Sequence, residues 1–380
     1  MSSNESNESL YRGETAAISR FGRFVVAELR VPHRVLSTSS VAGGQTESVR
    51  YLVNHQSCEG KAHIARHGVI TENGAEHYHG IVCSEINLPP DEVALMGTAA
   101  NMNYAVLRCE QFEDISVVAV VTAGVQGNAA RAGDPAVWHE REDGWTRLNP
   151  HNGTINTMLL FNWPLTPAAQ ARAVVTMTEA KTAALLELAT PSLYSEGLAT
   201  GTGTDQFCIA APLDSSRKPK QATSPHVKLG ELIGVAVRDA TKEALRWQNG
   251  LEPSYGRGLF HALGRFGLTE ARAHETLPRL LSEADYKLLK DNDKSVFYEP
   301  GVSAAAYAFA AVLDRIRYGT LPAGLARESL RQQAALMAVA LAAKPNDWHL
   351  HWSELQKAGE DDPIGLVLRA IALGWKSKWT

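Results

Sequence analysis

The chain has 380 residues, of which 44% are hydrophobic and 21% are charged, a composition typical of soluble globular proteins. Its net charge of -4 gives no electrostatic basis for nucleic-acid binding. No apolar run reaches the roughly 20 residues of a membrane helix, and the polar N-terminal stretch lacks the apolar core of a signal peptide. Four scattered cysteines are typical of reduced thiols. We therefore expect a cytoplasmic protein without nucleic-acid or membrane partners.

The first predicted elements are short strands. Residues 1–15 are rich in Ser, Asn and Glu, and we expect them to be disordered. From residue 24 onward, β-rich runs separated by turn residues predict strands, whereas residues 89–102, with proline and acidic residues at their start, predict a helix. Residues 104–124 predict two strands around an acidic turn. The second of these is nearly all apolar, which is typical of a strand buried on both faces.

Two strand–helix units follow. Residues 153–165 predict a strand, and the next helix begins with Thr166 as N-cap and Pro167 in the first turn. Residues 205–213 predict another strand before a helix at 224–247.

Beyond about residue 258 the pattern changes to amphipathic helices alone. We therefore divide the chain into a disordered N-terminus (1–15), an α/β or α+β domain (16–250) and a helical C-terminal extension (251–380). The apolar stripes of the extension favour homo-oligomers, although packing within one chain would bury them equally well.

The stretch GLATGTGTD, residues 197–205, is a candidate binding or catalytic loop. A P-loop would end in Gly-Lys-Ser/Thr, and a dinucleotide fingerprint would need a third glycine where Gln206 stands, so both nucleotide motifs are excluded. The glycines Gly201 and Gly203 allow backbone N–H groups to approach a ligand, while Thr202, Thr204 and Asp205 add polar side chains. The alternative is an ordinary connection between strands.

Two further elements carry polar groups in apolar surroundings. The loop TAGVQGNAARAGD, residues 122–134, holds Asn128, Arg131 and Asp134, and the last two could instead pair to pin the loop. Glu179 and Lys181 lie in the middle of an otherwise uncharged helix, where they are either solvated or functional.

The segment CEGKAHIARHGVITENGAEHYHGIVC has spacings that suit zinc or another transition metal. Short histidine patterns often match by chance, and EHYHG could equally be an exposed hairpin. The weak metal candidates are His63, His67, His77 and His79, beside Cys58 and Cys83.

Five stretches in order resemble the adenosylcobinamide amidohydrolase (CbiZ-type) family over about residues 35–245. They are VLSTSSVAGG, TAGVQGNAARAGD, GTINTMLLFNWPLTPAAQARAVVTMTEAKTAALLEL, ATGTGTD and KLGELIG. A fainter likeness of the strand–helix unit to DmpA-type aminopeptidases and ornithine acetyltransferases implies a layered αββα sandwich with mostly antiparallel sheets.

The resemblance implies hydrolysis of the amide that joins the corrin side chain of (adenosyl)cobinamide to aminopropanol, giving cobyric acid. Such a reaction needs a nucleophile or water, an oxyanion hole and an acid for the departing amine. No cofactor is certain; a bound metal is one option, and a substrate that itself carries cobalt or iron is another.

We assign candidate roles to residues of these stretches. Asp205 is a base or orients a nucleophile, and Thr202 or Thr204 supplies a hydroxyl. Further candidates for proton transfer are Glu179, Lys181 and His226. The substrate-binding candidates are Gly201, Gly203, Asn128, Arg131, Asp134 and Asn156.

Two other functions remain open at this point. The chain could hydrolyse another amide-bearing metal chelate, such as a hydroxamate siderophore, and release its metal. It could also bind a corrinoid without cutting it.

Overall fold

In the computed structural model the chain forms two compact units. The α/β unit comprises Met1–Tyr194 and Leu198–Leu251, and the helical unit comprises Ser195–Gly197 and Glu252–Thr380. For residues 60–72, 144–147 and 323 only the backbone is described. The residues described are 7–57, 60–142, 144–147, 153–252, 256, 258–357 and 362–379.

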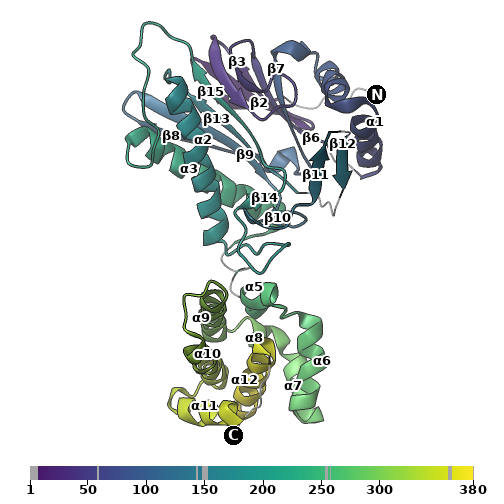
Figure 1. Ribbon diagram of the computed structural model, residues 1–380, viewed down its shortest axis with the longest axis vertical. Coiled ribbons are helices and arrows are strands. Elements are labelled where there is room, and N and C mark those ends of the chain that lie inside the picture. Colours follow the sequence, from purple (N-terminus) through teal and green to yellow (C-terminus); the bar gives the residue numbers. More distant parts are fainter. Residues whose placement is uncertain are drawn as a thin grey trace. The chain divides into compact units, whose positions relative to one another are not determined.

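Two sheets form the centre of the α/β unit (Figure 1). Sheet A contains, in spatial order, β1 (Glu8–Arg12), β2 (Ala16–Phe21), β3 (Phe24–Leu29), β6 (Tyr51–Gln56) and β7 (Val93–Thr98). Sheet B contains β5 (Gly44–Thr46), β4 (His33–Ser37), β15 (Gln206–Pro212), β13 (Ile155–Phe161), β9 (Ile115–Ala123) and β8 (Val106–Phe112). The two-stranded ribbons are β10 (Ala129–Ala130) with β14 (Gly201–Thr202), and β11 (Trp138–Arg141) with β12 (Gly144–Arg147).

Most neighbouring strands are antiparallel, and the two parallel pairs are each connected through a helix. Strands β6 and β7 are joined through α1 (Gly60–Glu85), and β13 and β15 are joined through α2 (Pro167–Glu187). The third helix is α3 (Lys228–Asn249). Short 3-10 turns lie at Pro90–Glu92 and Met102–Tyr104.

Three hydrophobic layers hold this unit together. The inner faces of the two sheets pack on each other, with Ile18 and Leu52 from sheet A and Met158 from sheet B in one cluster. The outer face of sheet B packs on α2 and α3, and the outer face of sheet A packs on α1. The unit is therefore an αββα sandwich with mostly antiparallel sheets, and the predicted α+β fold class is confirmed.

Local sequence signals explain the best-predicted elements. Thr166 caps α2, since its hydroxyl accepts a hydrogen bond from the Ala169 N–H at 3.2 Å, and Pro167 opens the helix. The predicted two-sided burial of β9 is confirmed, because Val117 contacts the helices and Val118 contacts the other sheet.

Two predicted segments differ from the structure. Residues 8–12, within the segment expected to be disordered, form β1, which pairs with β2 and packs Leu10 and Tyr11 on the inter-sheet core. The helix predicted at 89–102 is wrong, because its proline signal yields only a 3-10 turn and Val93–Thr98 then pairs with β6. Burial of these apolar residues in sheet A outweighs the helix-start signal.

The helical unit bears out the predicted helices. Its helices are α5 (Leu259–Leu263), α6 (Glu270–Leu280), α7 (Glu283–Asp291), α8 (Asp293–Phe297), α9 (Pro300–Arg317), α10 (Ala323–Ala342), α11 (Trp348–Lys357) and α12 (Pro363–Lys378). Its 3-10 turns are Gly264–Phe266 and Pro345–Asp347. They enclose a core of their own around Phe309, Ala338 and Trp375.

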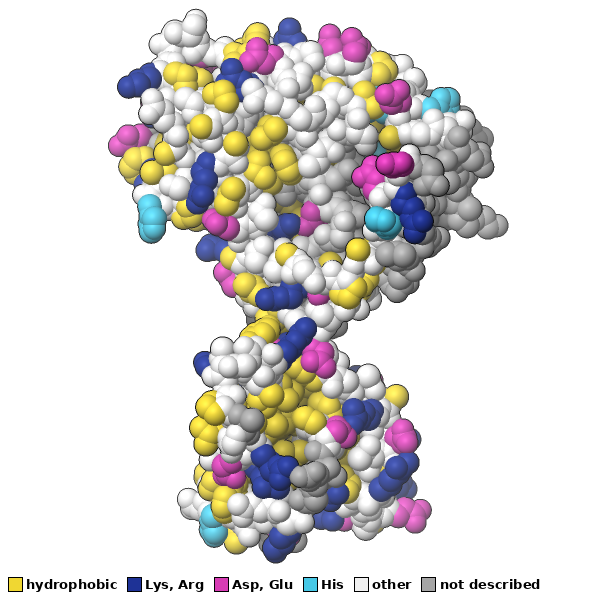
Figure 2. Space-filling view, viewed as in Figure 1, with side chains coloured by type: hydrophobic (Ala, Val, Ile, Leu, Met, Phe, Trp, Pro, Cys, Tyr) yellow, Lys and Arg dark blue, Asp and Glu magenta, His cyan; other side chains and the backbone are white. Residues whose placement is uncertain are grey.

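Surface side chains of both signs are interspersed on the face seen in Figure 2. Hydrophobic side chains gather on part of the helical unit there, and large exposed ones in this unit include Tyr318, Leu325 and Leu350. Self-association through these helices stays a prediction. No helix in the described part of the chain is long and apolar enough to cross a membrane.

Candidate active site

The small ribbon β10–β14 brings two of the predicted loops together at one end of sheet B. Ala129 pairs with Thr202 and Ala130 pairs with Gly201, so residues 124–134 and 199–205 lie side by side. Helix α2 packs against the same region and presents Lys181 to it.

Asp205 is the centre of the site. Its Oδ1 accepts hydrogen bonds from the Ile155 N–H at 3.0 Å and from the Thr202 hydroxyl at 2.5 Å. Its Oδ2 accepts from the Thr202 N–H at 3.1 Å and forms an ion pair with the Lys181 ammonium. The side chains of Lys181 and Asp205 are only 14% and 18% exposed, so solvent screens this pair weakly.

Gly201 is required by the closeness of this ion pair. A Cβ at this position would lie 2.4 Å from Asp205 Oδ2 and 2.8 Å from Lys181 Nζ. The glycine therefore leaves the space in which the two charged groups meet, which is a packing reason that the loop sequence alone does not reveal.

Thr204 and Asn128 belong to a hydrogen-bonded network beside the site. The Thr204 hydroxyl donates to the Gly153 carbonyl at 2.9 Å and bonds to the Thr154 hydroxyl. The Asn128 amide donates to the same carbonyl at 2.8 Å and accepts from the Tyr194 hydroxyl at 2.6 Å. These bonds hold the loop in shape and occupy groups proposed for nucleophile and oxyanion roles, so Thr202 is the better-placed hydroxyl.

Arg131 and Asp134 stabilise the neighbouring loop through separate bonds. The Asp134 carboxylate accepts from the Arg131 backbone N–H at 2.7 Å and from the Ser192 hydroxyl at 2.5 Å. The Arg131 guanidinium donates to the Leu198 carbonyl at 3.0 Å. The predicted contact between Arg131 and Asp134 is thus made through the Arg131 backbone N–H and not through its guanidinium group.

A cavity of about 750 Å³ opens over these groups. It is lined by Asn128, Arg131, Asp134, Lys181, Gly201, Thr202, Gly203 and Asp205, which the sequence pointed to, together with Trp138, Thr178, Thr182, Tyr194 and their neighbours. The sequence does not predict the two aromatic residues that line the cavity, Trp138 and Tyr194, because no periodic pattern links them to the glycine-rich loops. Burial and the Asp134 carboxylate raise the pKa of Tyr194, which keeps its phenol a hydrogen-bond donor.

Besides Thr204, which belongs to the network beside the site, three predicted residues are absent from the lining of this cavity. Glu179 and His226 are exposed and are not part of its lining. Asn156 is fully buried between the sheets, where its amide donates to the Asn54 side chain at 2.8 Å and to the Gly97 carbonyl at 3.1 Å. Neighbours on strands alternate between faces, so Asn156 points away from the cavity.

The histidine-rich segment is helical, not a hairpin. Residues 60–85 form α1, which is interrupted by a kink at Gly74, where φ is 83°. His77 is exposed, and His79 Nε2 donates to the Pro90 carbonyl at 2.8 Å. Cys58 and the side chains of His63 and His67 lie outside the described residues. Among described side chains, metal-ligand atoms converge at Glu270, His274 and Asp293 of the helical unit, within 4.8 Å of one another.

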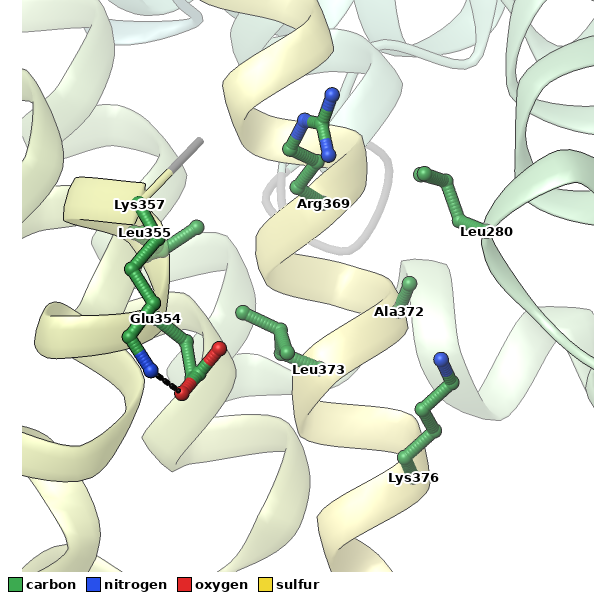
Figure 3. A pocket seen from close by; sticks show the side chains of 8 residues that line it. All are labelled: Leu280, Glu354, Leu355, Lys357, Arg369, Ala372, Leu373 and Lys376. Carbon is green, nitrogen blue, oxygen red and sulfur yellow. Dashed lines mark hydrogen bonds and ion pairs between the residues drawn. The ribbon is translucent and has the colours of Figure 1, made fainter. Parts of the chain in front are cut away.

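The helical unit has a cavity of its own, of about 270 Å³ (Figure 3). Leu280, Leu355 and Leu373 form apolar walls, and Lys357 pairs with Glu354 at 2.5 Å. The described side chains that line it include no hydroxyl, thiol or imidazole group, so it has no counterpart of the Thr202 hydroxyl beside Asp205.

Comparison with known proteins identifies the family of the chain. The model of the adenosylcobinamide amidohydrolase family matches residues 9–253, which span the whole sandwich and the loops around Asp205. The chain belongs to this family. The resemblance noted from the sequence is thereby confirmed, and the family is one of hydrolases.

Individual relatives add little about activity. An uncharacterized protein of Methanocaldococcus jannaschii is 37% identical to this family member over 177 residues, which are 44% of this chain and 68% of that protein. A crystal structure of a protein from Pyrococcus horikoshii OT3 matches at a TM-score of 0.28 and 11% identity, over 63% of this chain and 82% of that one. The helical unit lies beyond the family match, apart from its first residues.

Proposed function

We propose that the protein hydrolyses the amide between the corrin side chain and aminopropanol in (adenosyl)cobinamide, giving cobyric acid and the free amine. Family membership supports the reaction class. The observation that carries the proposal is the contact of a hydroxyl, a carboxylate and an ammonium group in the wall of a large cavity, at Thr202, Asp205 and Lys181.

Thr202 is the proposed nucleophile. Its hydroxyl lies 2.5 Å from Asp205 Oδ1, within the distance at which a carboxylate takes the proton of an attacking oxygen. The Ile155 N–H and the Lys181 ammonium hold that carboxylate in place. Attack on the amide carbon forms a tetrahedral adduct with Thr202 and moves the hydroxyl proton to Asp205; the ester with Thr202 forms when the C–N bond then breaks.

Charge develops on the carbonyl oxygen during this attack. The Thr202 N–H is bonded to Asp205, and the Asn128 amide is bonded to Gly153. The Gly203 N–H, for which no partner is found in the described part of the chain, is therefore the proposed oxyanion donor.

Lys181 is the proposed acid for the departing amine. When the C–N bond breaks, the amine takes a proton from the Lys181 ammonium, and Asp205 passes its own proton across the ion pair to restore Lys181. Water then hydrolyses the ester with Asp205 as base, which releases the carboxylic acid and regenerates the hydroxyl.

A mass-spectrometric turnover assay tests the proposal. Purified wild-type protein, Thr202→Val and Thr202→Ser are offered adenosylcobinamide and a ferric hydroxamate siderophore in parallel. We expect release of aminopropanol from cobinamide, a loss of about 100-fold or more in Thr202→Val, and partial activity in Thr202→Ser. Thr46→Val, on the edge strand β5, is the matched control and should keep full activity.

Other outcomes would assign other functions. Cleavage of the siderophore instead would mean that the fold is kept for a different metal chelate. Tight corrinoid binding without turnover would leave a binding protein and would reject the hydrolase.

A further inference from the structure

A second, smaller pocket lies on the other face of the strand that begins beside Asp205. It has a volume of about 250 Å³, and its lining includes Ser39, Ser40, His55, Gly97 and Gln206. Ser39 and Ser40 belong to the stretch VLSTSSVAGG, which the proposed reaction leaves without a role. We call this the Gln206 pocket.

Gln206 and Asp205 are consecutive, and their contacts show that they point to opposite faces of sheet B. Asp205 meets Lys181 of α2 on the helix side, whereas Gln206 Oε1 accepts from the Gly97 N–H of β7 at 2.9 Å on the sheet side. Because a backbone N–H can only donate, the atom facing Gly97 is the oxygen. The amide NH₂ group of Gln206 therefore remains as a donor for the pocket, and the described residues offer it no partner.

A tight turn carries Ser40 to the same pocket. A Cβ at Gly43 would lie 1.9 Å from the Ser39 carbonyl oxygen, so only glycine allows this turn to close. Ser39 anchors the turn, since its hydroxyl donates to the Val41 carbonyl at 2.6 Å and accepts from the Leu95 N–H at 3.0 Å. Ser40 is exposed at the turn and lines the pocket with a hydroxyl that both donates and accepts.

The walls of the pocket are polar but carry no charged side chain among the described residues. His55 Nδ1 donates to the Met96 carbonyl at 3.2 Å, and its Nε2 is hydrogen-bonded to the Tyr78 hydroxyl at 2.8 Å. Among the described lining residues a carboxylate or phosphate meets no Lys or Arg side chain, whereas the amide of Gln206 and the hydroxyl of Ser40 match a neutral group with both acceptor and donor atoms.

We propose that the Gln206 pocket binds a peripheral carboxamide arm of the substrate. This proposal rests on the proposed function, because the corrin ring carries amide arms around its periphery. The pocket has room for roughly eight water volumes, enough for one arm but not for the ring. Gln206 and Ser40 thus set the position of the ring while the neighbouring arm reaches Thr202 and Asp205.

Equilibrium binding and turnover of cobinamide by three variants test the role of the pocket. Gln206→Glu keeps an oxygen for the Gly97 N–H but replaces the two donors, and Ser40→Ala removes the hydroxyl from an exposed position. Gln111→Glu, on the exposed face of β8, is the matched control.

We expect Kd and KM to rise about 10-fold in Gln206→Glu and about threefold in Ser40→Ala, with kcat within about twofold of wild type. The control should be unchanged. Unaltered Kd in both variants, or a fall in kcat at constant Kd, would overturn the proposal.

A second measurement separates this proposal from the proposed function. Propionamide, propionate and propylamine are titrated against the full chain while the His55 ring protons are followed by NMR. We expect propionamide alone to shift them, and not in Gln206→Glu. If cobinamide is neither bound nor cleaved but propionamide behaves in this way, the pocket stands and the reaction fails. No response to propionamide would reject the carboxamide pocket.

Discussion

Replacing Asp205 by Asn removes one charge from the closest ion pair of the candidate site. The carboxylate accepts bonds from two backbone N–H groups, the Thr202 hydroxyl and the Lys181 ammonium. Asparagine can keep the Oδ1 bonds, but its NH₂ group would then face the ammonium, donor against donor. The variant leaves Lys181 charged, poorly solvated and without its anion.

The expected magnitudes follow from this geometry. Breaking a buried ion pair costs about 3–5 kcal/mol, and partial exposure of both side chains lowers this to about 2–3 kcal/mol of unfolding free energy. Loss of the base that accepts the Thr202 proton should reduce kcat by about 10²–10⁴-fold. A second substitution, Lys181→Met, removes the uncompensated charge and should restore about 1–2 kcal/mol without restoring activity.

Urea unfolding and aminopropanol release measure the two effects separately. The matched control is Glu187→Gln, because Glu187 pairs with Lys242 at 2.6 Å but the two side chains are 47% and 34% exposed. It should cost less than about 1 kcal/mol and leave kcat unchanged. If Asp205→Asn retained kcat within about threefold of wild type, the assignment of Asp205 as the base would be refuted.

Three further predictions concern glycines, pH and thiols. Gly201→Ala should lower the rate of aminopropanol release by about 100-fold because its methyl group forces the ion pair apart, and an unchanged rate would contradict this. Gly234→Ala in α3, where a Cβ meets nothing within 4 Å, should raise the unfolding free energy by about 0.5–1 kcal/mol, and a lower value in urea unfolding would contradict this. Burial lowers the pKa of His33, so the unfolded chain binds the proton more readily than the folded chain. The contribution of His33 to stability should be full above about pH 6.5 and should fall as the pH drops below that value. His33→Gln should reduce this dependence of the unfolding temperature on pH. In a Cys58→Ser background, a thiol reagent should modify the exposed Cys109 quickly and reach Cys208, whose pKa burial raises to about 12, only on unfolding; equal rates for the two thiols would contradict this.

Much of the candidate site could be predicted because its backbone is locally encoded. The glycine- and threonine-rich loop needs small residues and donors in sequence, and Asp205, Thr202, Lys181 and Asn128 all lie at or beside the cavity. Glu179, two residues before Lys181, is on the exposed face of the same helix. Helical spacing alone could not choose between them, since the choice depends on which face of α2 packs on sheet B.

Residues whose roles depend on distant partners could not be predicted. Tyr194 is hydrogen-bonded to Asn128, 66 residues away in the chain. Gln206 is hydrogen-bonded to Gly97 at a separation of 109 residues. Asn156 is a predicted substrate-binding residue, but its place on β13 turns it into the layer between the sheets.

Local sequence signals predict that α2 begins at Thr166 and Pro167, that residues 115–123 form a strand buried on both faces, that the C-terminal region is helical, and which loops are rich in glycine. Only contacts in the folded chain make Val93–Thr98 a strand, through pairing with β6, and bring Lys181 rather than Glu179 to Asp205. The physical reason is the distance along the chain over which each interaction acts. Caps, turns and apolar periodicity act over a few residues, whereas sheet pairing and the meeting of charges depend on contacts between segments that only the folded chain brings together.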